Sequence, residues 1–329
     1  MNSIVARIPA EHLLRVTTLN IFHAAEEVER RTRLICDELV ALRPAVVCLQ
    51  EVRFDEDGTS PQLESIAAVT SLRVVAAHGQ HPRKNGGLSG NAVLSVLPLV
   101  ESGAIVFGTP DCQLTLADYA VLRTDTGQSL IIISAHLAWG GDQEGTRLTQ
   151  LTVIDARVRA LMDKYKDRHP VAVLAGDFNT LPGSDTNRYL NGQGAGTDGG
   201  YTFWTEAFAT VGNPNEATTV DAGNFWAQKT ARGVGIEFPE MLPDRRIDYV
   251  WTYGWAYGRP GCPVAMQRSF TDTTRYGYPA SDHYGLTVDF WTPPVLTPVP
   301  AELLTADDIL TGQLMLDLDI AAKGGPVLV

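Results

Sequence analysis

The order of apolar and polar residues along this chain shows the periods of both strands and helices. Residues 13–22, LLRVTTLNIF, are mostly apolar or β-branched, which predicts a buried strand. From Val28 to Leu42 apolar residues recur at steps of three and four, which predicts an amphipathic helix that ends before Pro44. The run AVVCLQ then predicts a second buried strand that delivers Glu51 at its carboxyl end.

The same two patterns continue along the chain. Helices are predicted over about residues 63–72 and 143–165. Strands are predicted at residues 73–77, 91–98, 104–107, 119–123, 129–136, 171–176, 245–253 and 283–291. Two segments that Gly and Pro interrupt, 78–90 and 184–245, are expected to be loops. Strands that form hairpin-like runs and also alternate with helices predict an α/β fold, in which two packed sheets carry helices on their outer faces.

Residues 1–295 are expected to form one domain, because a fold with two sheets can exceed the usual ~150 residues. The segment TPPVLTPVP that follows has the composition of a linker. From Ala301 onward the tail carries five acidic residues and one Lys, a net charge of −4. Its pattern fits either a strand or a helix, so the structure of residues 296–329 stays open.

Composition and net charge narrow the classes of protein to which this chain can belong. Of the 329 residues, 44% are apolar and 19% are charged, which is typical of a globular protein. The net charge of −12 argues against a broad basic face for nucleic acid. The four cysteines are scattered, and the motifs of phosphate-loop enzymes, zincins and serine hydrolases are absent. No apolar run reaches the roughly 20 residues of a membrane span, and the N-terminus lacks a signal-peptide pattern, so a cytoplasmic location is expected.

Several polar side chains stand at the ends of the predicted strands. They are Asn20, Glu51, His136, Asp177, Asn179, Asp248, Asp282 and His283. Singly, each also fits a structural role as a turn former, a cap or a residue at the edge of the core. Strand ends of one sheet meet at one edge, however, where residues distant in sequence can share a pocket. Carboxylates and an amide oxygen suit Mg²⁺ or Mn²⁺, and histidines can handle protons or phosphate charge.

The order of these elements resembles that of the endonuclease/exonuclease/phosphatase superfamily. The matching segments are TTLNIF, CLQEV, SGNAVLS, SAHL, GDFN, RRIDYV and SDHYG, which run from about residue 13 to 291. The superfamily includes pancreatic-type deoxyribonucleases, abasic-site endonucleases, neutral sphingomyelinases, inositol polyphosphate 5-phosphatases and deadenylases. The resemblance implies a four-layer α/β/β/α sandwich. Abasic-site endonucleases carry a Tyr where this chain has His136, which argues against that subfamily.

The resemblance also implies roles for individual residues. Glu51 is similar to the principal metal ligand of the family, with Asn20 and Asp282 as further ligands. Asp177 and Asn179 of GDFN resemble the pair that positions the attacking water and contacts the scissile phosphate.

Four further residues complete the implied site. His136 resembles the histidine that binds a phosphate oxygen, and Asp248 with His283 resembles the carboxylate–histidine pair. Asn91 of SGNAVLS is similar to an asparagine near the pocket. A general base fits either His283, which the sequence favours slightly, or Asp177.

Substrate specificity is expected to lie in loops. Arg83 and Lys84 of the 78–90 segment are expected at the pocket rim as substrate-binding residues. The segment WTYGWAYG, residues 251–258, sets aromatic rings at every second position, which fits a buried sheet face, a stacking surface for bases or a cage for a cationic headgroup.

The sequence thus predicts a Mg²⁺-dependent hydrolase of phosphoesters. The expected reaction is attack by water on a small-molecule, headgroup or nucleotide phosphodiester. Because the net charge is acidic, a DNA or RNA nuclease ranks second. A non-catalytic protein that binds a phosphate ligand on the same fold is the third hypothesis. The pattern does not determine the oligomeric state.

Overall fold

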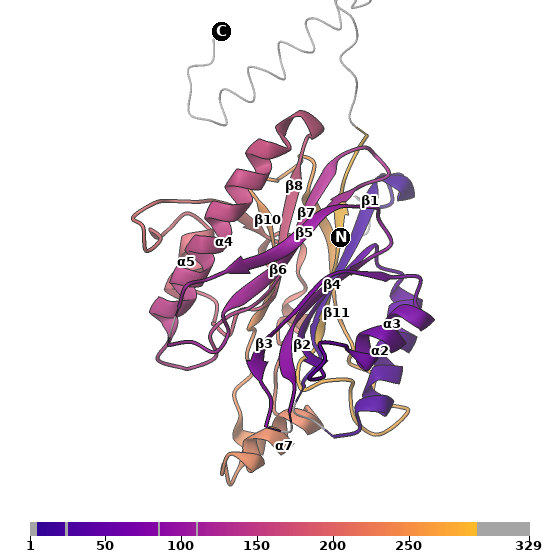
Figure 1. Ribbon diagram of the computed structural model, residues 1–329, viewed down its shortest axis with the longest axis vertical. Coiled ribbons are helices and arrows are strands. Elements are labelled where there is room, and N and C mark those ends of the chain that lie inside the picture. The colour runs from indigo at the N-terminus through magenta and orange to yellow at the C-terminus, as the bar shows by residue number, and fades with distance from the viewer. Residues whose placement is uncertain (1–4, 24–25, 85, 110, 295–329) are drawn as a thin grey trace, which may run out of the picture. The chain divides into compact units, whose positions relative to one another are not determined.

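The computed structural model describes residues 5–23, 26–84, 86–109 and 111–294 (Figure 1). The chain divides into two units, Met1–Pro294 and Val295–Val329. The linker and acidic tail predicted from residue 296 onward lie outside the described residues. Among the described helices, none combines the length and the apolar character that crossing a membrane requires.

Two six-stranded sheets form the centre of the first unit. The first sheet has the order β11-β12-β1-β2-β4-β3, with strands β1 Leu13–Asn20, β2 Val46–Phe54, β3 Arg73–Pro82, β4 Leu88–Ser95, β11 Cys262–Ser269 and β12 Gly285–Trp291. The second has the order β5-β6-β7-β8-β10-β9, with strands β5 Leu99–Val106, β6 Leu116–Arg123, β7 Ser129–His136, β8 Val171–Asp177, β9 Trp204–Glu206 and β10 Asp248–Tyr253. The central pairs β1–β2 and β7–β8 are parallel, so each pair ends at one edge of its sheet.

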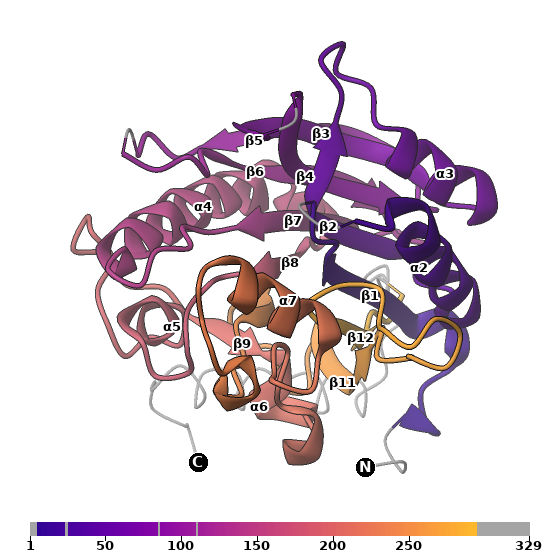
Figure 2. The same ribbon diagram turned by 90° about the horizontal axis from the view of Figure 1, so that it is seen from below.

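Helices cover the outer faces of both sheets (Figure 2). The helices α2 Val28–Leu42 and α3 Pro61–Val69 pack on the first sheet, and the helix α4 Glu144–Lys164 packs on the second beside α5 Asp185–Leu190. The α/β/β/α sandwich predicted from the sequence is therefore confirmed. The helix predicted at 63–72 starts and ends earlier than expected, because Ser60 caps α3 and Pro61 occupies its first turn.

The strand β1 shows how the layers produce the sequence pattern. Val16 points into the apolar layer between the sheets, whereas Leu19 points outward and packs under α2 with Ile35. Both faces of β1 are buried, which accounts for its nearly continuous apolar run. Burying each of these side chains stabilises the fold by about 2 kcal/mol. On the inner face, the last positions are Thr18 and Asn20, so the layer between the sheets becomes polar toward the carboxyl end of β1.

The loop predicted at 78–90 is shorter in the structure. The strand β3 continues to Pro82, and β4 begins at Leu88, with His78 paired opposite Asn91. The pairing register shifts twice along this hairpin. Because β3 is an edge strand, it tolerates a proline that cannot donate a hydrogen bond, and the Gly and Pro signals were therefore misleading.

The segment 184–245 is more ordered than predicted. It contains α5, β9, α6 Ala207–Val211 and α7 Phe225–Gly233. Trp204 and Trp226 are 1% and 2% exposed, and their burial holds these short elements on the domain. The strand β11 was missed, because an edge strand has a weak apolar alternation.

The aromatic segment 251–258 does not form one face. The strand β10 ends at Tyr253, and Gly254 follows with a φ of +78°. Trp251 is buried, as a sheet face requires, whereas Trp255 and Tyr257 beyond the strand are exposed.

Candidate active site

Polar side chains gather where the parallel strands end. Asn20, His136 and Asp177 are the last residues of β1, β7 and β8, and Glu51 lies in the second half of β2. Asp248, the first residue of β10, pairs directly with Asp177 in the antiparallel register. Strands from both sheets therefore bring these residues together at one edge.

Asp177 lies at the centre of this cluster. Its Oδ2 accepts a hydrogen bond from Asn20 Nδ2 at 3.0 Å, and lies 3.4 Å from His136 Nε2 and 3.7 Å from His283 Nε2. Its Oδ1 accepts from the backbone N–H of Asn179 at 2.9 Å. Asp177 is 1% exposed, so these contacts form in a water-poor environment where electrostatic interactions are strong.

A glycine makes this arrangement sterically possible. Gly176 has a φ of +146° and pairs with Ala135 of β7, where an added Cβ would lie 1.9 Å from the Ala135 carbonyl oxygen. Only a residue without Cβ allows this close approach of backbones. The same register then places His136 beside Asp177.

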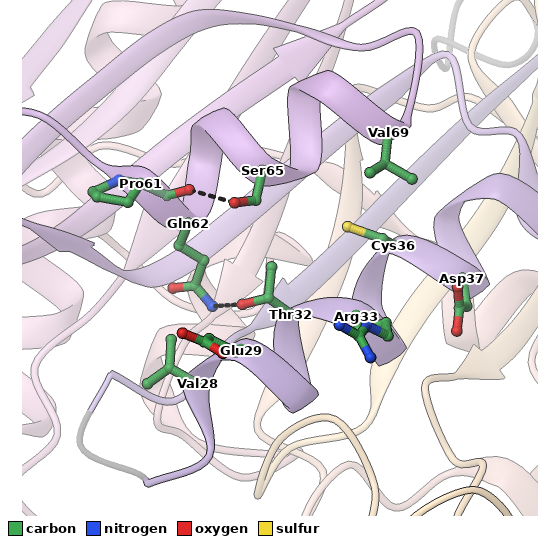
Figure 3. Close-up of a pocket in the computed structure, with 10 residues that line it drawn as sticks. All are labelled: Val28, Glu29, Thr32, Arg33, Cys36, Asp37, Pro61, Gln62, Ser65 and Val69. Carbon is green, nitrogen blue, oxygen red and sulfur yellow. Dashed lines mark hydrogen bonds between the residues drawn. The ribbon is translucent and has the colours of Figure 1, made fainter.

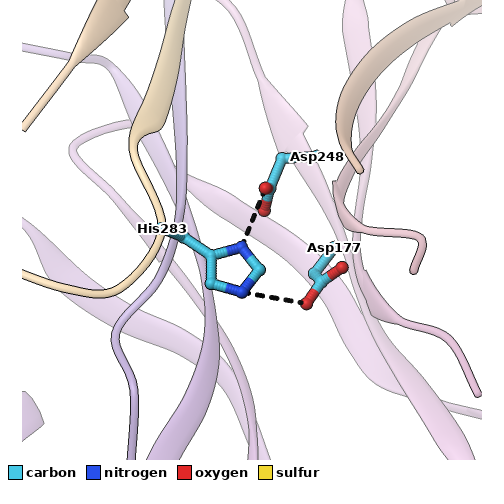
Figure 4. A group of neighbouring side chains, drawn as sticks. All are labelled: Asp177, Asp248 and His283. Carbon is cyan, nitrogen blue, oxygen red and sulfur yellow. Dashed lines mark hydrogen bonds and ion pairs between the residues drawn. The ribbon is translucent and has the colours of Figure 1, made fainter. Parts of the chain in front are cut away.

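Asp248 and His283 form a buried pair (Figure 4). His283 Nδ1 lies 2.8 Å from Asp248 Oδ2, which leaves Nε2 directed at Asp177. Burial lowers the pKa of His283, but the carboxylates of Asp248 and Asp177 outweigh it and the pKa lies well above its usual value. Burial also raises the pKa of Asp248, whose Oδ1 has no hydrogen-bond partner among the described residues.

Glu51 reaches the site through an irregularity of β2. The pairing with β4 shifts between Leu49 and Val52, and Glu51 has a φ of +58°, which is uncommon for a residue with a side chain. Glu51 Oε1 accepts from Asn20 Nδ2 at 3.1 Å, and Oε2 lies 2.5 Å from His23 Nδ1. Burial raises the pKa of Glu51, but the contact with His23 outweighs this effect, so the net pKa is lowered.

Asp282 lies in the loop before β12. Ser281 Oγ donates to the Asn20 carbonyl at 2.6 Å, which fixes this loop against the end of β1. Burial raises the pKa of Asp282 to about 6, and the carboxylates of Glu51 and Asp177 add to the rise. Glu51 and Asp282, the two carboxylates predicted to share a cation, are thus close enough to repel each other electrostatically.

The donor set fits a hard divalent cation. Buried carboxylates that repel one another are stabilised by a shared cation, and the unpaired Oδ1 of Asp248 is a free ligand atom. Ligand atoms of Asp177, Asp248 and His283 all lie within 4.8 Å of one another. This group shares no residue with the predicted ligands Glu51, Asn20 and Asp282, so the cluster offers two separate sets of potential ligands.

Asn20 directs its amide nitrogen, and not its amide oxygen, toward the carboxylates of the site. Its Oδ1 accepts from the backbone N–H of Phe22 at 3.0 Å, while its Nδ2 donates to Glu51 and to Asp177. In this arrangement Asn20 links two carboxylates. Its amide would have to turn over to offer the oxygen to a cation.

The three predicted substrate-binding residues lie on the β3–β4 hairpin. Asn91 is buried, and its Nδ2 donates to the Leu116 carbonyl at 3.2 Å. Arg83 donates from Nη2 to the Phe54 carbonyl at 3.1 Å, and Lys84 is exposed. None of the three has a described contact with Asp177.

Two residues of the site were missed in the sequence. His23 contacts Glu51, and its signal was its place directly after the strand that ends at Asn20. Arg31 of α2 is buried, and burial lowers its pKa to about 10. Arg31 lies four residues before Ile35 and therefore on the apolar face of the helix. A charged residue at such a position is the sequence feature that could have identified it.

Arg31 joins the two loops that flank the site. Its Nη1 donates to the carbonyls of Ile21 at 2.7 Å and Ala280 at 3.1 Å, and its Nη2 donates to the Phe22 carbonyl at 2.9 Å. These carbonyls follow Asn20 and precede Asp282, so one guanidinium fixes both segments.

A groove is present elsewhere on the surface of the described residues. It lies between α2 and α3, has a volume of about 650 Å³ and is lined by residues such as Thr32, Cys36 and Gln62 (Figure 3). None of the predicted site residues lines it. Volume alone therefore does not locate the chemistry of this protein.

The comparison with protein families agrees with this geometry. The sequence model of the Endonuclease/Exonuclease/phosphatase family matches residues 17–283. The chain belongs to this family. Its members are metal-dependent phosphoester hydrolases. The hypothesis of a non-catalytic binding protein is correspondingly disfavoured.

Individual relatives are distant. Carbon catabolite repressor protein 4 homolog 3 from Arabidopsis thaliana is 26% identical over 168 residues, which cover 49% of this chain and 35% of that protein. The chain thus spans about a third of the length of this curated relative.

Solved structures show the same fold. TDP2 from Caenorhabditis elegans superposes with a TM-score of 0.62 at 16% identity, covering 85% of this chain and 98% of that chain. TDP2 from D. rerio, solved with a single-strand DNA product, superposes with a TM-score of 0.61 at 18% identity, covering 84% and 98%.

Proposed function

We propose that this enzyme hydrolyses phosphodiester bonds with the help of a divalent cation, Mg²⁺ or, in its place, Mn²⁺. The observation that carries the proposal is the position of Asp177 Oδ2, within 3.7 Å of nitrogen atoms from Asn20, His136 and His283. A carboxylate surrounded by three potential donors marks the place where a water and an anionic phosphate can be held together.

The side chains divide the work. Asp177 and Asn179 position the attacking water, and His136 donates to a phosphate oxygen. Asp248 holds the ring of His283 by Nδ1, so that Nε2 stays directed into the site. The carboxylates of Asp248 and Asp177 raise the pKa of His283, which shifts its ring toward the protonated form. This charge state favours Asp177 as the acceptor of the water's proton, in place of the slight preference for His283 drawn from the sequence.

Glu51 and Asp282 are the carboxylates proposed to hold the cation. A divalent cation bound there would neutralise the negative charge that develops on the phosphate and on its leaving oxygen. Arg31 keeps the two carboxylates in register by fixing the loops on which they depend.

The proposed substrate is a small-molecule, headgroup or nucleotide phosphodiester. The net charge of −12 disfavours a long polyanion, because electrostatic repulsion opposes the association of two polyanions. A cytoplasmic location also stays a prediction from the sequence.

The test uses purified full-length protein stripped of metal with a chelator. Hydrolysis of a nitrophenyl phosphodiester is expected to appear on addition of Mg²⁺ or Mn²⁺, and to disappear in Glu51→Gln. His78→Gln is the matched control, because His78 forms an Asp–His pair outside the cluster. Equal background rates for wild type and Glu51→Gln over a panel of nucleotides, sphingomyelin and inositol phosphates would overturn the proposal.

A nuclease is the second candidate. The observation in its favour is the structural likeness to TDP2 from D. rerio, which was solved with a single-strand DNA product. Nicking of a plasmid or shortening of a single-stranded oligonucleotide that vanishes in Glu51→Gln would establish it. Hydrolysis of small diesters alone would exclude it.

A further inference from the structure

Trp139 is a large apolar side chain left in water. It is 68% exposed and lies three residues beyond His136, in the loop between β7 and α4. Single exposed apolar residues are common in proteins, so exposure alone indicates no role. The inference rests on how the loop is held and on where it lies.

The backbone on both sides of Trp139 is fixed by buried side chains of α4. Arg147 donates from Nη1 to the carbonyls of Ala138 at 2.8 Å and Gly140 at 2.7 Å. The N–H of Ala138 donates to Gln150 Oε1 at 2.9 Å. Arg147 and Gln150 are 4% and 0% exposed, so ordered groups support the loop. An exposed ring on a rigid backbone is preorganised for contact, because binding then costs little ordering of the chain.

The same loop adjoins the centre of the site. The N–H of Leu137 donates to the Asp177 carbonyl at 2.9 Å, and Asn179 Nδ2 donates to the Leu137 carbonyl at 3.1 Å. Three residues of chain span at most about 10 Å, so the backbone of Trp139 lies within that distance of His136.

We propose that Trp139 is the stacking surface for a nucleobase carried by the phosphodiester substrate. The inference rests on the proposed function and specifies its substrate class. A tryptophan ring stacks on any base, because every base presents a π-face. The recognition is therefore expected to favour base-bearing over base-free diesters with little preference among bases.

The chain offers a matched control. Trp255 is 60% exposed and stacks on Phe203, with ring centroids 5.3 Å apart. It follows the far end of β10, whose first residue is Asp248. Five strand steps of about 3.3 Å each separate the two ends, so Trp255 lies remote from Asp248. Its exposed fraction is comparable to that of Trp139.

The kinetic test compares a dinucleotide with its base-free sugar-phosphate analogue, at saturating Mg²⁺. Trp139→Ala is expected to lower kcat/KM for the dinucleotide by about ten-fold, mainly through KM, and to leave the analogue unchanged. Trp139→Phe should restore most of the loss, and Trp255→Ala should behave as wild type. An equal loss on both substrates, or no loss on either, overturns the stacking role while leaving the proposed function standing.

A binding test does not depend on turnover. Titration with adenosine 5′-monophosphate is expected to quench tryptophan fluorescence in wild type and in Trp255→Ala, and not in Trp139→Ala. Quenching that persists in Trp139→Ala, or is absent in wild type, contradicts the stacking role. If the protein hydrolyses no phosphodiester but shows this quenching pattern, the proposed function fails and the base-binding site stands.

Discussion

Among the described residues, two buried aspartates of the second sheet each contact a histidine from outside that sheet, and the two Asp–His pairs differ in what surrounds them. Asp248 of β10 contacts Nδ1 of His283, and Asp118 of β6 contacts Nδ1 of His78. Both aspartates are buried, with exposed fractions of 1% and 0%. The His283 side chain is 11% exposed and directs Nε2 at Asp177, whereas the His78 side chain is 43% exposed.

The comparison shows that an Asp–His pair is not by itself a catalytic device. Both pairs hold an imidazole in one orientation and raise its pKa. Only His283 faces a third group, the Asp177 carboxylate, at a place where carboxylates and imidazoles from several strands meet. We therefore expect the first pair to control activity and the second to control stability.

The largest effect on activity is expected from a substitution of Asp177, the carboxylate that His283 faces. Asp177→Asn keeps the shape of the side chain but removes its charge, and should lower metal-dependent kcat by about 10³-fold. The kcat is measured from the steady-state hydrolysis of a nitrophenyl phosphodiester. Asp118→Asn is the matched control, because it removes an equally buried charge, and its kcat should stay close to wild type. A comparable loss in both variants would contradict the division of roles.

A smaller loss is expected when the first pair is broken. Asp248→Asn leaves His283 in place but removes the carboxylate that orients its ring, and should lower kcat by about 10²-fold. The thermal unfolding midpoint, followed by circular dichroism, distinguishes this effect from misfolding. If Asp248→Asn keeps wild-type kcat, the orientation of His283 has no part in the reaction.

The second pair, Asp118 and His78, is expected to affect the stability of the fold. His78→Ala leaves the buried carboxylate of Asp118 without its imidazole partner, which should lower the free energy of unfolding by about 1–3 kcal/mol. Urea denaturation of wild type and variant measures the difference. His78→Gln, whose amide can still donate, should recover part of it. Wild-type stability in His78→Ala would show that water replaces the imidazole.

The smallest effect concerns pH. The hydrogen bond to Asp118 raises the pKa of His78, so its stabilising contribution is complete below about pH 6.5 and is lost as pH rises through the folded-state pKa. Burial raises the pKa of Asp118, which also makes stability fall with rising pH. The stability of wild type relative to Asp118→Asn should therefore fall between pH 5 and 9. A rise in this relative stability over the same pH range would contradict the prediction.

Much of the fold was readable from local patterns. The strands around Asn20, Glu51 and Asp177 bury both faces, and their apolar runs end at polar residues that the structure brings to one edge. Strands were predicted for both arms of the hairpin through His78, but their extension into residues 78–90 was not readable, because this part of the edge strand contains Gly and Pro. The contact of Glu51 with His23 was not readable either, because a bulge in β2 sets it.

The sequence by itself determined which residues are buried in strands and helices, because the spacing of apolar side chains follows the geometry of each element. It also determined the family and the set of polar residues available for chemistry. Only the tertiary structure decided which of two Asp–His pairs meets Asp177, which arginine fixes the loops and which tryptophan adjoins the site. Those contacts join residues far apart in the chain, and they depend on sheet register and strand order, which local spacing does not encode.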